Sequence, residues 1–130
     1  MKDELTMFWV NKAKNDLLNA DNNLNSDNIP HDTVCFHCQQ AVEKLLKAFL
    51  VYKEQNIPRT HDLLSILELI KPLEDSVEVL RDYLVILNPY AIEIRYPDTL
   101  SMPVLEDSKE ARDASERVLT WLKKILPDLF

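Results

Sequence analysis

One stretch decides the fold of this chain, residues 31–53, HDTVCFHCQQAVEKLLKAFLVYK. Its apolar residues recur every three or four positions, which places them on one side of an α-helix. These residues are Val34, Cys35, Cys38, Val42, Leu45 and Phe49. A second stripe of the same helix is polar and consists of His37, Gln40, Lys44 and Lys47. The pattern predicts a helix that packs on one side and forms the wall of a candidate site on another.

The remaining sequence shows further helical patterns separated by breaks that contain Pro or Asn. We expect helices over about 5–24, 31–55, 61–70, 74–87 and 104–126. Thr60 is the expected N-cap of the third helix, with Asp62 in its first turn, where the helix dipole favours an anion. Residues 90–98, YAIEIRYPD, form an irregular or short helical piece. Their apolar alternation also suits a strand, but one isolated strand has nothing to pair with.

These elements predict one all-α domain over residues 1–130. Short connections favour an up-and-down antiparallel bundle of four long helices plus one short helix. The chain contains no Gly, so neither the dinucleotide-binding fingerprint nor a P-loop is present. An all-helical fold is the class that loses least from the absence of Gly.

The charge is acidic overall but uneven along the chain. The net charge is -7, whereas residues 38–61 contain four basic and two acidic groups. Unspecific nucleic-acid binding depends on neutralising phosphates with Lys and Arg, so the whole surface disfavours it. A local basic patch on the second helix remains compatible with this composition.

The sequence predicts a reduced, cytoplasmic protein that does not span a membrane. The first ten residues, MKDELTMFWV, contain acids and no sustained apolar run, unlike a signal peptide. Charges interrupt every apolar run that would otherwise suit a membrane span. With no signal peptide, the two cysteines are expected to be reduced.

Cys35 and Cys38 form a C-x-x-C within the apolar stripe of the second helix. His31 shares their face, which makes a three-ligand metal site conceivable. No second ligand pair completes a tetrahedron, and free cysteines commonly behave as small buried hydrophobes. We therefore expect structural cysteines, with no metal ion and no cofactor.

Glu43 and Lys47 are spaced i, i+4, a pairing that commonly stabilises an exposed helix surface. Lys44 lies along the stripe of His37 and Gln40, for which a solvated polar face is the simplest interpretation. A binding role gains weight only if another basic or aromatic element faces these residues.

Arg95-Tyr96-Pro97 is the candidate for that facing element. Arg offers a bidentate fork for phosphate, and Tyr offers a stacking surface. The competing interpretation pairs Arg95 with Asp16 or Asp62, which would hold the loop against the bundle. His61 follows the expected cap and is more simply a packing or capping residue than a catalyst.

Four short motifs together resemble the HEPN domains of bacteria and archaea. They are Trp9-x-x-x-Ala13-x-x-Asp16-Leu17, Gln39-Gln40-Ala41-Val42-Glu43-Lys44-x-x-Lys47-Ala48, Thr60-His61-Asp62-Leu63 and Arg95-Tyr96-Pro97. The resemblance covers about residues 8–126 and implies a bundle of about five helices, usually a homodimer with a functional cleft between subunits. It also implies a frequent partner, a small nucleotidyltransferase encoded nearby, in modules that look like toxin–antitoxin pairs. Other members are thought to bind nucleotides.

Many HEPN proteins are metal-independent ribonucleases whose motif is an Arg followed, four to six positions later, by a His. None of the five arginines here has a His in that window, and no His occurs after His61. The resemblance therefore does not carry the ribonuclease motif over. It implies nucleotide or phosphate binding by Gln40, Lys44, Lys47, His61, Arg95 and Tyr96. It leaves a structural polar network to Asp16, Glu43 and Asp62.

The leading hypothesis is a non-catalytic, dimeric binding module that engages a nucleotide, RNA or a partner nucleotidyltransferase. One alternative is a degenerate ribonuclease in which Arg95 meets His61 in space. Another is a purely structural module whose acidic segment 62–113, with twelve acidic and five basic groups, docks a basic protein.

Overall fold

The computed structural model describes residues 2–92 and 102–130, and all regular secondary structure within those ranges is helical. The α-helices are α1 (Lys2–Leu24), α2 (His31–Tyr52), α3 (Leu63–Ile70), α4 (Arg81–Leu87) and α5 (Leu105–Ile125). Short 3₁₀ turns occupy η1 (Asp75–Leu80), η2 (Asn88–Tyr90) and η4 (Pro127–Leu129). The predicted all-α class is confirmed.

Three of the helices are long and two are short, which differs from the expected four long and one short. α3 has 8 residues and α4 has 7, against 21 to 23 for α1, α2 and α5. The helix expected over 74–87 is divided into η1 and α4. Val77 and Leu80, three positions apart, are both buried, and a 3₁₀ turn places such residues on one side. That spacing also fits an α-helix, so the sequence pattern does not distinguish the two.

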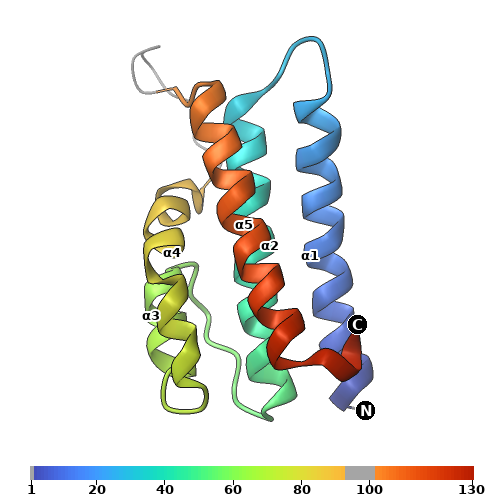
Figure 1. The fold of residues 1–130 in the computed structure, drawn as a ribbon, viewed down its shortest axis with the longest axis vertical. Helices are drawn as coiled ribbons and strands as arrows, with labels where there is room; N and C mark the ends of the chain where they lie inside the picture. The colour runs from blue at the N-terminus through green and yellow to red at the C-terminus, as the bar shows by residue number, and fades with distance from the viewer. Residues whose placement is uncertain (1, 93–101) are drawn as a thin grey trace.

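The directions of the long helices differ from strict alternation. In Figure 1 the chain ascends along α1, descends along α2 and descends again along α5. Two contacts agree with this parallel arrangement. His31 Nδ1 lies 2.9 Å from Ser108 Oγ near the two helix starts, and the rings of Phe49 and Trp121 lie 5.5 Å apart near the two ends.

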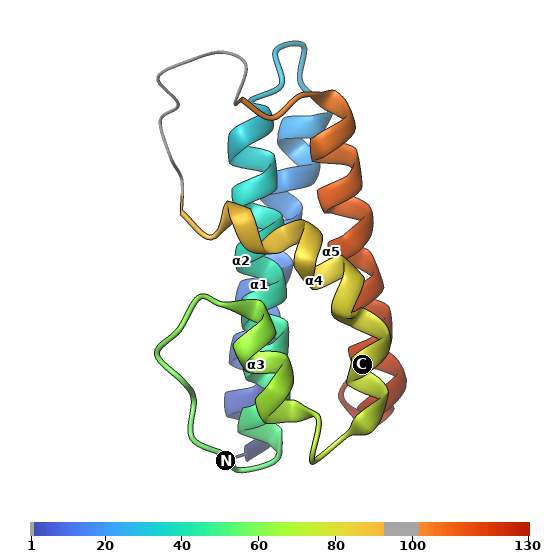
Figure 2. The same cartoon turned by 90° about the vertical axis from the view of Figure 1, so that its left-hand side faces the viewer.

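The cause of this change of direction is the segment 53–62, which we call the return segment. It runs back along the molecule from the end of α2, as Figure 2 shows, so that α3 starts beside the middle of α2. A hydrogen bond of 2.8 Å between His61 and Glu43 marks the point of contact. α3 therefore runs in the same direction as α2. α4 then runs back in the opposite direction, and α5 runs in the direction of α2 again.

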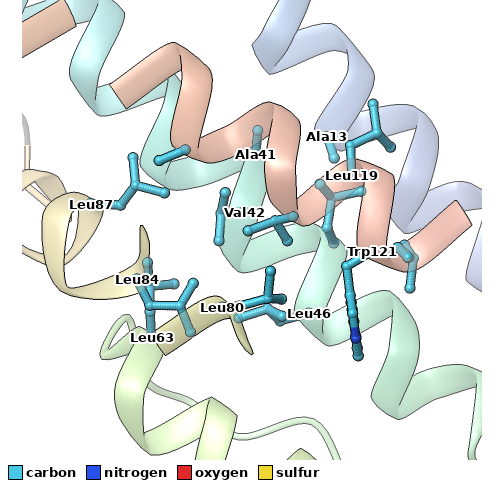
Figure 3. Packing of buried hydrophobic residues seen from close by; sticks show 14 of the residues in the cluster. Ala13, Ala41, Val42, Leu46, Leu63, Leu80, Leu84, Leu87, Leu119 and Trp121 are labelled. Atoms are coloured by element: carbon cyan, nitrogen blue, oxygen red, sulfur yellow. The ribbon is translucent and has the colours of Figure 1, made fainter. Parts of the chain in front are cut away.

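α2 is the central element of a single core. Between Val34 and Val51 only four of its residues escape burial: Phe36, His37, Gln40 and Lys44. Figure 3 shows Val42 and Leu46 of α2 between leucines of α4 on one side and Leu119 and Trp121 of α5 on the other. Because α2 is covered on nearly all sides, its few accessible polar residues mark a narrow face.

Candidate functional site

Asp16 of α1 holds two polar residues of the α2 stripe. Its Oδ1 lies 2.9 Å from His37 Nδ1, and its Oδ2 accepts a hydrogen bond from Lys44 Nζ. An ionised carboxylate only accepts hydrogen bonds, so Nδ1 is the protonated nitrogen of His37. The Asp16 side chain is 12% exposed, compared with 26% for Lys44. Asp16 thus joins α1 to α2 through these two side chains.

Glu43 forms a second, more deeply buried centre. Its Oε2 accepts a hydrogen bond from Lys47 Nζ at 2.9 Å, and its Oε1 lies 2.8 Å from His61 Nδ1. The side chains of Glu43 and Lys47 are only 7% and 9% exposed. The surface pair expected from the i, i+4 spacing is therefore a buried pair, because the return segment covers this side of α2.

The amide of Gln39 fixes the same segment through its backbone. Gln39 is fully buried, and its Nε2 donates to the carbonyl oxygen of His61 at 3.1 Å. Its Oε1 accepts a hydrogen bond from Gln40 Nε2 at 2.8 Å. The site residues inferred from the sequence included Gln40 but not Gln39 or His37. The signal available for Gln39 was a polar amide directly beside the buried stripe of a central helix.

Asp62 is a helix cap and not a member of the Glu43 network. It is the N-cap of α3, where its carboxylate accepts from the backbone N–H of Leu64 at 3.1 Å. Ser65 Oγ and Asn88 Nδ2 also donate to it, and these hydrogen bonds lower its pKa. The expectation that Thr60 caps this helix is wrong. Thr60 Oγ1 instead accepts from the backbone N–H of Asp62, one step before the helix begins.

Apart from Asp62, the described site residues fall into two clusters on α2, one around Asp16 and one around Glu43. Two carboxylates, Asp16 and Glu43, each contact one lysine and one histidine. Through the carbonyl oxygen of His61, the Glu43 cluster also includes Gln39 and, through Gln39, Gln40. Arg95 and Tyr96 lie outside the described residues, so their approach to a ligand, to Asp16 or to Asp62 stays a prediction.

Both cysteines are free and fully buried, as expected for structural residues. Burial raises the pKa of Cys35 to about 12 and that of Cys38 to about 11. The negative charge that Cys38 would carry further raises the pKa of Cys35. A thiolate is the reactive form, so neither cysteine is activated for chemistry.

Each of the two carboxylates is paired with one lysine, so these four formal charges cancel. Among residues 2–92 and 102–130, no group of three or more His, Cys, Asp or Glu is placed to hold a metal ion. Within the same ranges, no helix has the length and hydropathy needed to cross a membrane.

The comparisons with known proteins agree with the helical architecture and motif order. The chain has no significant match among curated proteins and none among solved structures. The family model described as HEPN domain matches residues 6–125, nearly the whole chain. This match includes α1 from Thr6 onward, α2, the return segment, α3, α4 and α5. The chain therefore belongs to the HEPN domain family.

Proposed function

We propose that this HEPN domain is a non-catalytic binding module that recognises a nucleotide through its phosphate groups. The proposed contact surface, called the α2 face, consists of His37, Gln40, Lys44 and His61. One observation carries the proposal: two carboxylates hold two lysines and two histidines in fixed positions around a single helix.

Preorganisation supports phosphate binding at this face. Lys44 is tied to Asp16, and His61 to Glu43, so little side-chain entropy is lost when a ligand arrives. His61 is 66% exposed, and its Nδ1 contacts Glu43, which leaves Nε2 to meet a phosphate oxygen. A hydrogen bond from a charged donor to phosphate is stronger than a neutral one.

The buried Lys47 acts differently in this proposal. It is 9% exposed and donates to Glu43, so it positions the carboxylate that orients His61. The expected direct contacts are therefore the four residues of the α2 face, completed by Arg95 and Tyr96. Family membership supports a further expectation of a homodimer and of a small nucleotidyltransferase as partner, in a toxin–antitoxin-like module.

Isothermal calorimetry with ATP, GTP and a short RNA tests the ligand. We expect wild type to bind at least one of them, and Lys44→Ala and Arg95→Ala each to weaken binding by about tenfold, the loss of one charge-assisted hydrogen bond. Lys109→Ala is the matched control, because Lys109 is an exposed lysine on α5 away from the α2 face. Absence of binding to all three ligands, or equal weakening by the control, would refute the proposal.

Incubation with RNA in chelator tests the non-catalytic part. We expect no cleavage by wild type. Cleavage that disappears in both His61→Ala and Arg95→Ala would overturn this part and identify a degenerate ribonuclease.

The partner is tested separately by co-expression with the product of the adjacent gene. We expect co-purification, and light scattering of the isolated protein at the mass of two chains. A monomer that does not co-purify with the neighbouring gene product would reject the proposed dimer and partner. The proposed nucleotide binding would be unaffected, because calorimetry tests it separately.

A further inference from the structure

A second candidate site lies between η1, the start of α4 and the C-terminal half of α5. The described residues there line a hollow with a volume of about 430 Å³. Pockets for small organic ligands commonly measure roughly 300–1,000 Å³. None of its lining residues belongs to α1, α2 or the return segment, so the hollow is separate from the α2 face.

The walls of the hollow are mostly apolar and include two aromatic rings. Val79, Leu80, Tyr83, Trp121 and Ile125 form them. Val79 is 69% exposed, whereas Leu80 and Trp121 are buried. The hollow thus has a floor continuous with the core and an apolar residue open to solvent, a form suited to a flat apolar group.

The polar groups on the η1 side of the hollow already have partners. Trp121 Nε1–H donates to Ser76 Oγ at 3.0 Å, and Ser76 Oγ donates to Glu74 Oε2 at 2.8 Å. These bonds fix the indole and satisfy its only donor. A ligand ring beside Trp121 therefore leaves no buried indole N–H unpaired.

The α5 side supplies two cations and a hydroxyl on one stripe of the helix. Arg117, Thr120 and Lys124 are spaced i, i+3 and i+7 and all line the hollow. The Nε of Arg117 lies 3.7 Å from Asp113, and both side chains are about 60% exposed, so this ion pair is weak. Counting Arg117 and Lys124 against Glu74, the lining has a net charge of +1 on a chain of -7.

We propose that this hollow binds a small aromatic or cyclic carboxylate. The ring lies against Trp121, Tyr83 and Ile125, and the carboxylate reaches Arg117 and Lys124. Thr120 between them offers a hydroxyl donor. The apolar walls and single excess charge favour such a monoanion over a nucleotide, whose polyphosphate would need more cations.

The test uses 2-naphthoate as the probe and 2-naphthalenemethanol as its neutral counterpart. In a Trp9→Phe background, Trp121 is the remaining tryptophan and reports on the hollow by fluorescence. We expect saturable quenching, with the carboxylate bound about tenfold more tightly than the alcohol, as one charged interaction implies. Arg117→Ala and Lys124→Ala should weaken naphthoate binding several-fold, while alcohol binding changes little.

Two controls separate this site from the α2 face and from general instability. Lys109→Ala and Lys44→Ala should leave naphthoate binding unchanged, which keeps this result independent of the nucleotide proposal. Val79→Glu introduces a carboxylate at an exposed position and should abolish naphthoate binding without changing the circular dichroism spectrum.

The proposal is overturned by the absence of saturable quenching up to millimolar probe, or by equal affinity for the acid and the alcohol. It is also overturned if naphthoate does not bind and Val79→Glu alters the oligomeric state by light scattering. That last result would assign the hollow to a contact between protein chains.

Discussion

Glu43 shows how burial changes the meaning of a simple residue pair. An i, i+4 Glu–Lys pair in solvent contributes a few tenths of a kcal/mol. Here both side chains are less than 10% exposed, and the same carboxylate also contacts His61. Removing one member of such a pair leaves the other charged, buried and without its partner.

We predict that Glu43→Gln lowers the free energy of unfolding by about 3 kcal/mol, the range found when one partner of a buried pair is removed. Glu43→Gln/Lys47→Met should recover much of this loss, because the double variant buries no unpaired charge. Urea denaturation of Glu43→Gln, of Lys47→Met and of the double variant measures the coupling free energy between the two side chains.

The matched control is Asp113→Asn, which breaks an exposed i, i+4 pair with Arg117. It should change the free energy of unfolding by less than about 0.5 kcal/mol. A similar small effect for Glu43→Gln would contradict the buried role of the pair.

The cysteines yield a second prediction at this scale. Their raised pKa values and full burial predict that 5,5′-dithiobis(2-nitrobenzoate) labels them in the native protein slower by a factor on the order of 10² than in urea. Both thiols should react once the chain unfolds. Rapid labelling of either cysteine without denaturant would contradict their position in the core.

The raised thiol pKa values also set a pH dependence. An unfolded thiol ionises near pH 8.5, whereas the folded thiols ionise at about 12 and about 11. The unfolded chain therefore binds fewer protons than the folded chain between these limits. The free energy of unfolding should fall as pH rises above about 8.5, and less steeply in Cys35→Ala/Cys38→Ala. Urea denaturation at pH 8 and pH 10 measures the fall in the free energy of unfolding for wild type and for the double variant.

Among the elements, α3 depends most on its cap. It has only 8 residues, and its N-cap Asp62 also accepts a hydrogen bond from Asn88 at the end of α4. Asn88 Oδ1 in turn accepts from the backbone N–H of Leu63 at 2.9 Å. These hydrogen bonds hold the N-terminus of α3 against the C-terminus of α4, and they thereby stabilise the position of the return segment that leads into α3.

We predict that Asp62→Ala lowers the free energy of unfolding by about 1–2 kcal/mol, the usual effect of losing a cap. Asp62→Asn should retain much of the capping. Because hydrogen bonds lower the pKa of Asp62, its ionised form contributes stability above the unfolded pKa near 3.9. That contribution is lost as pH falls through the lower folded pKa.

Urea denaturation at pH 7 and near pH 3 checks this element. The advantage of wild type over Asp62→Asn should narrow at the lower pH, since Asn does not titrate. An advantage that widens on acidification would contradict the cap assignment.

The whole molecule has one core to which all five α-helices contribute. α2 lies at its centre, with α1, α3, α4 and α5 packed around it. No smaller unit of the described chain has an apolar core of its own. A small domain of this kind commonly unfolds in one cooperative transition.

We predict that Trp121 fluorescence in the Trp9→Phe background and circular dichroism at 222 nm give the same urea midpoint. Trp121 reports the contact between α5 and η1, and circular dichroism reports all helices. A fluorescence transition at lower urea would show that α3 and α4 detach before the long helices unfold. Wild type, with both tryptophans, is the reference.

The helical class, the positions of the three long helices, the buried cysteines and the polar stripe of α2 follow from local pattern. Helix 31–52 was expected over 31–55, and α5 over 104–126, within a few residues of their observed ends. Periodicity and Pro act over one or two turns, so the sequence by itself determines these features. Motif order also identified the HEPN family, which the family model confirms.

Only the tertiary structure decided what those polar residues do. Whether Glu43 and Lys47 are exposed depends on the return segment, whose contacting residue His61 lies 18 positions after Glu43 in the chain. The parallel course of α2 and α5 depends on the same segment. The hollow beside Trp121 depends on how η1 meets α5. Each of these features is a contact between residues far apart in the chain. Many other ways of packing the same helices would satisfy the local sequence pattern equally well, so that pattern does not determine which contacts form.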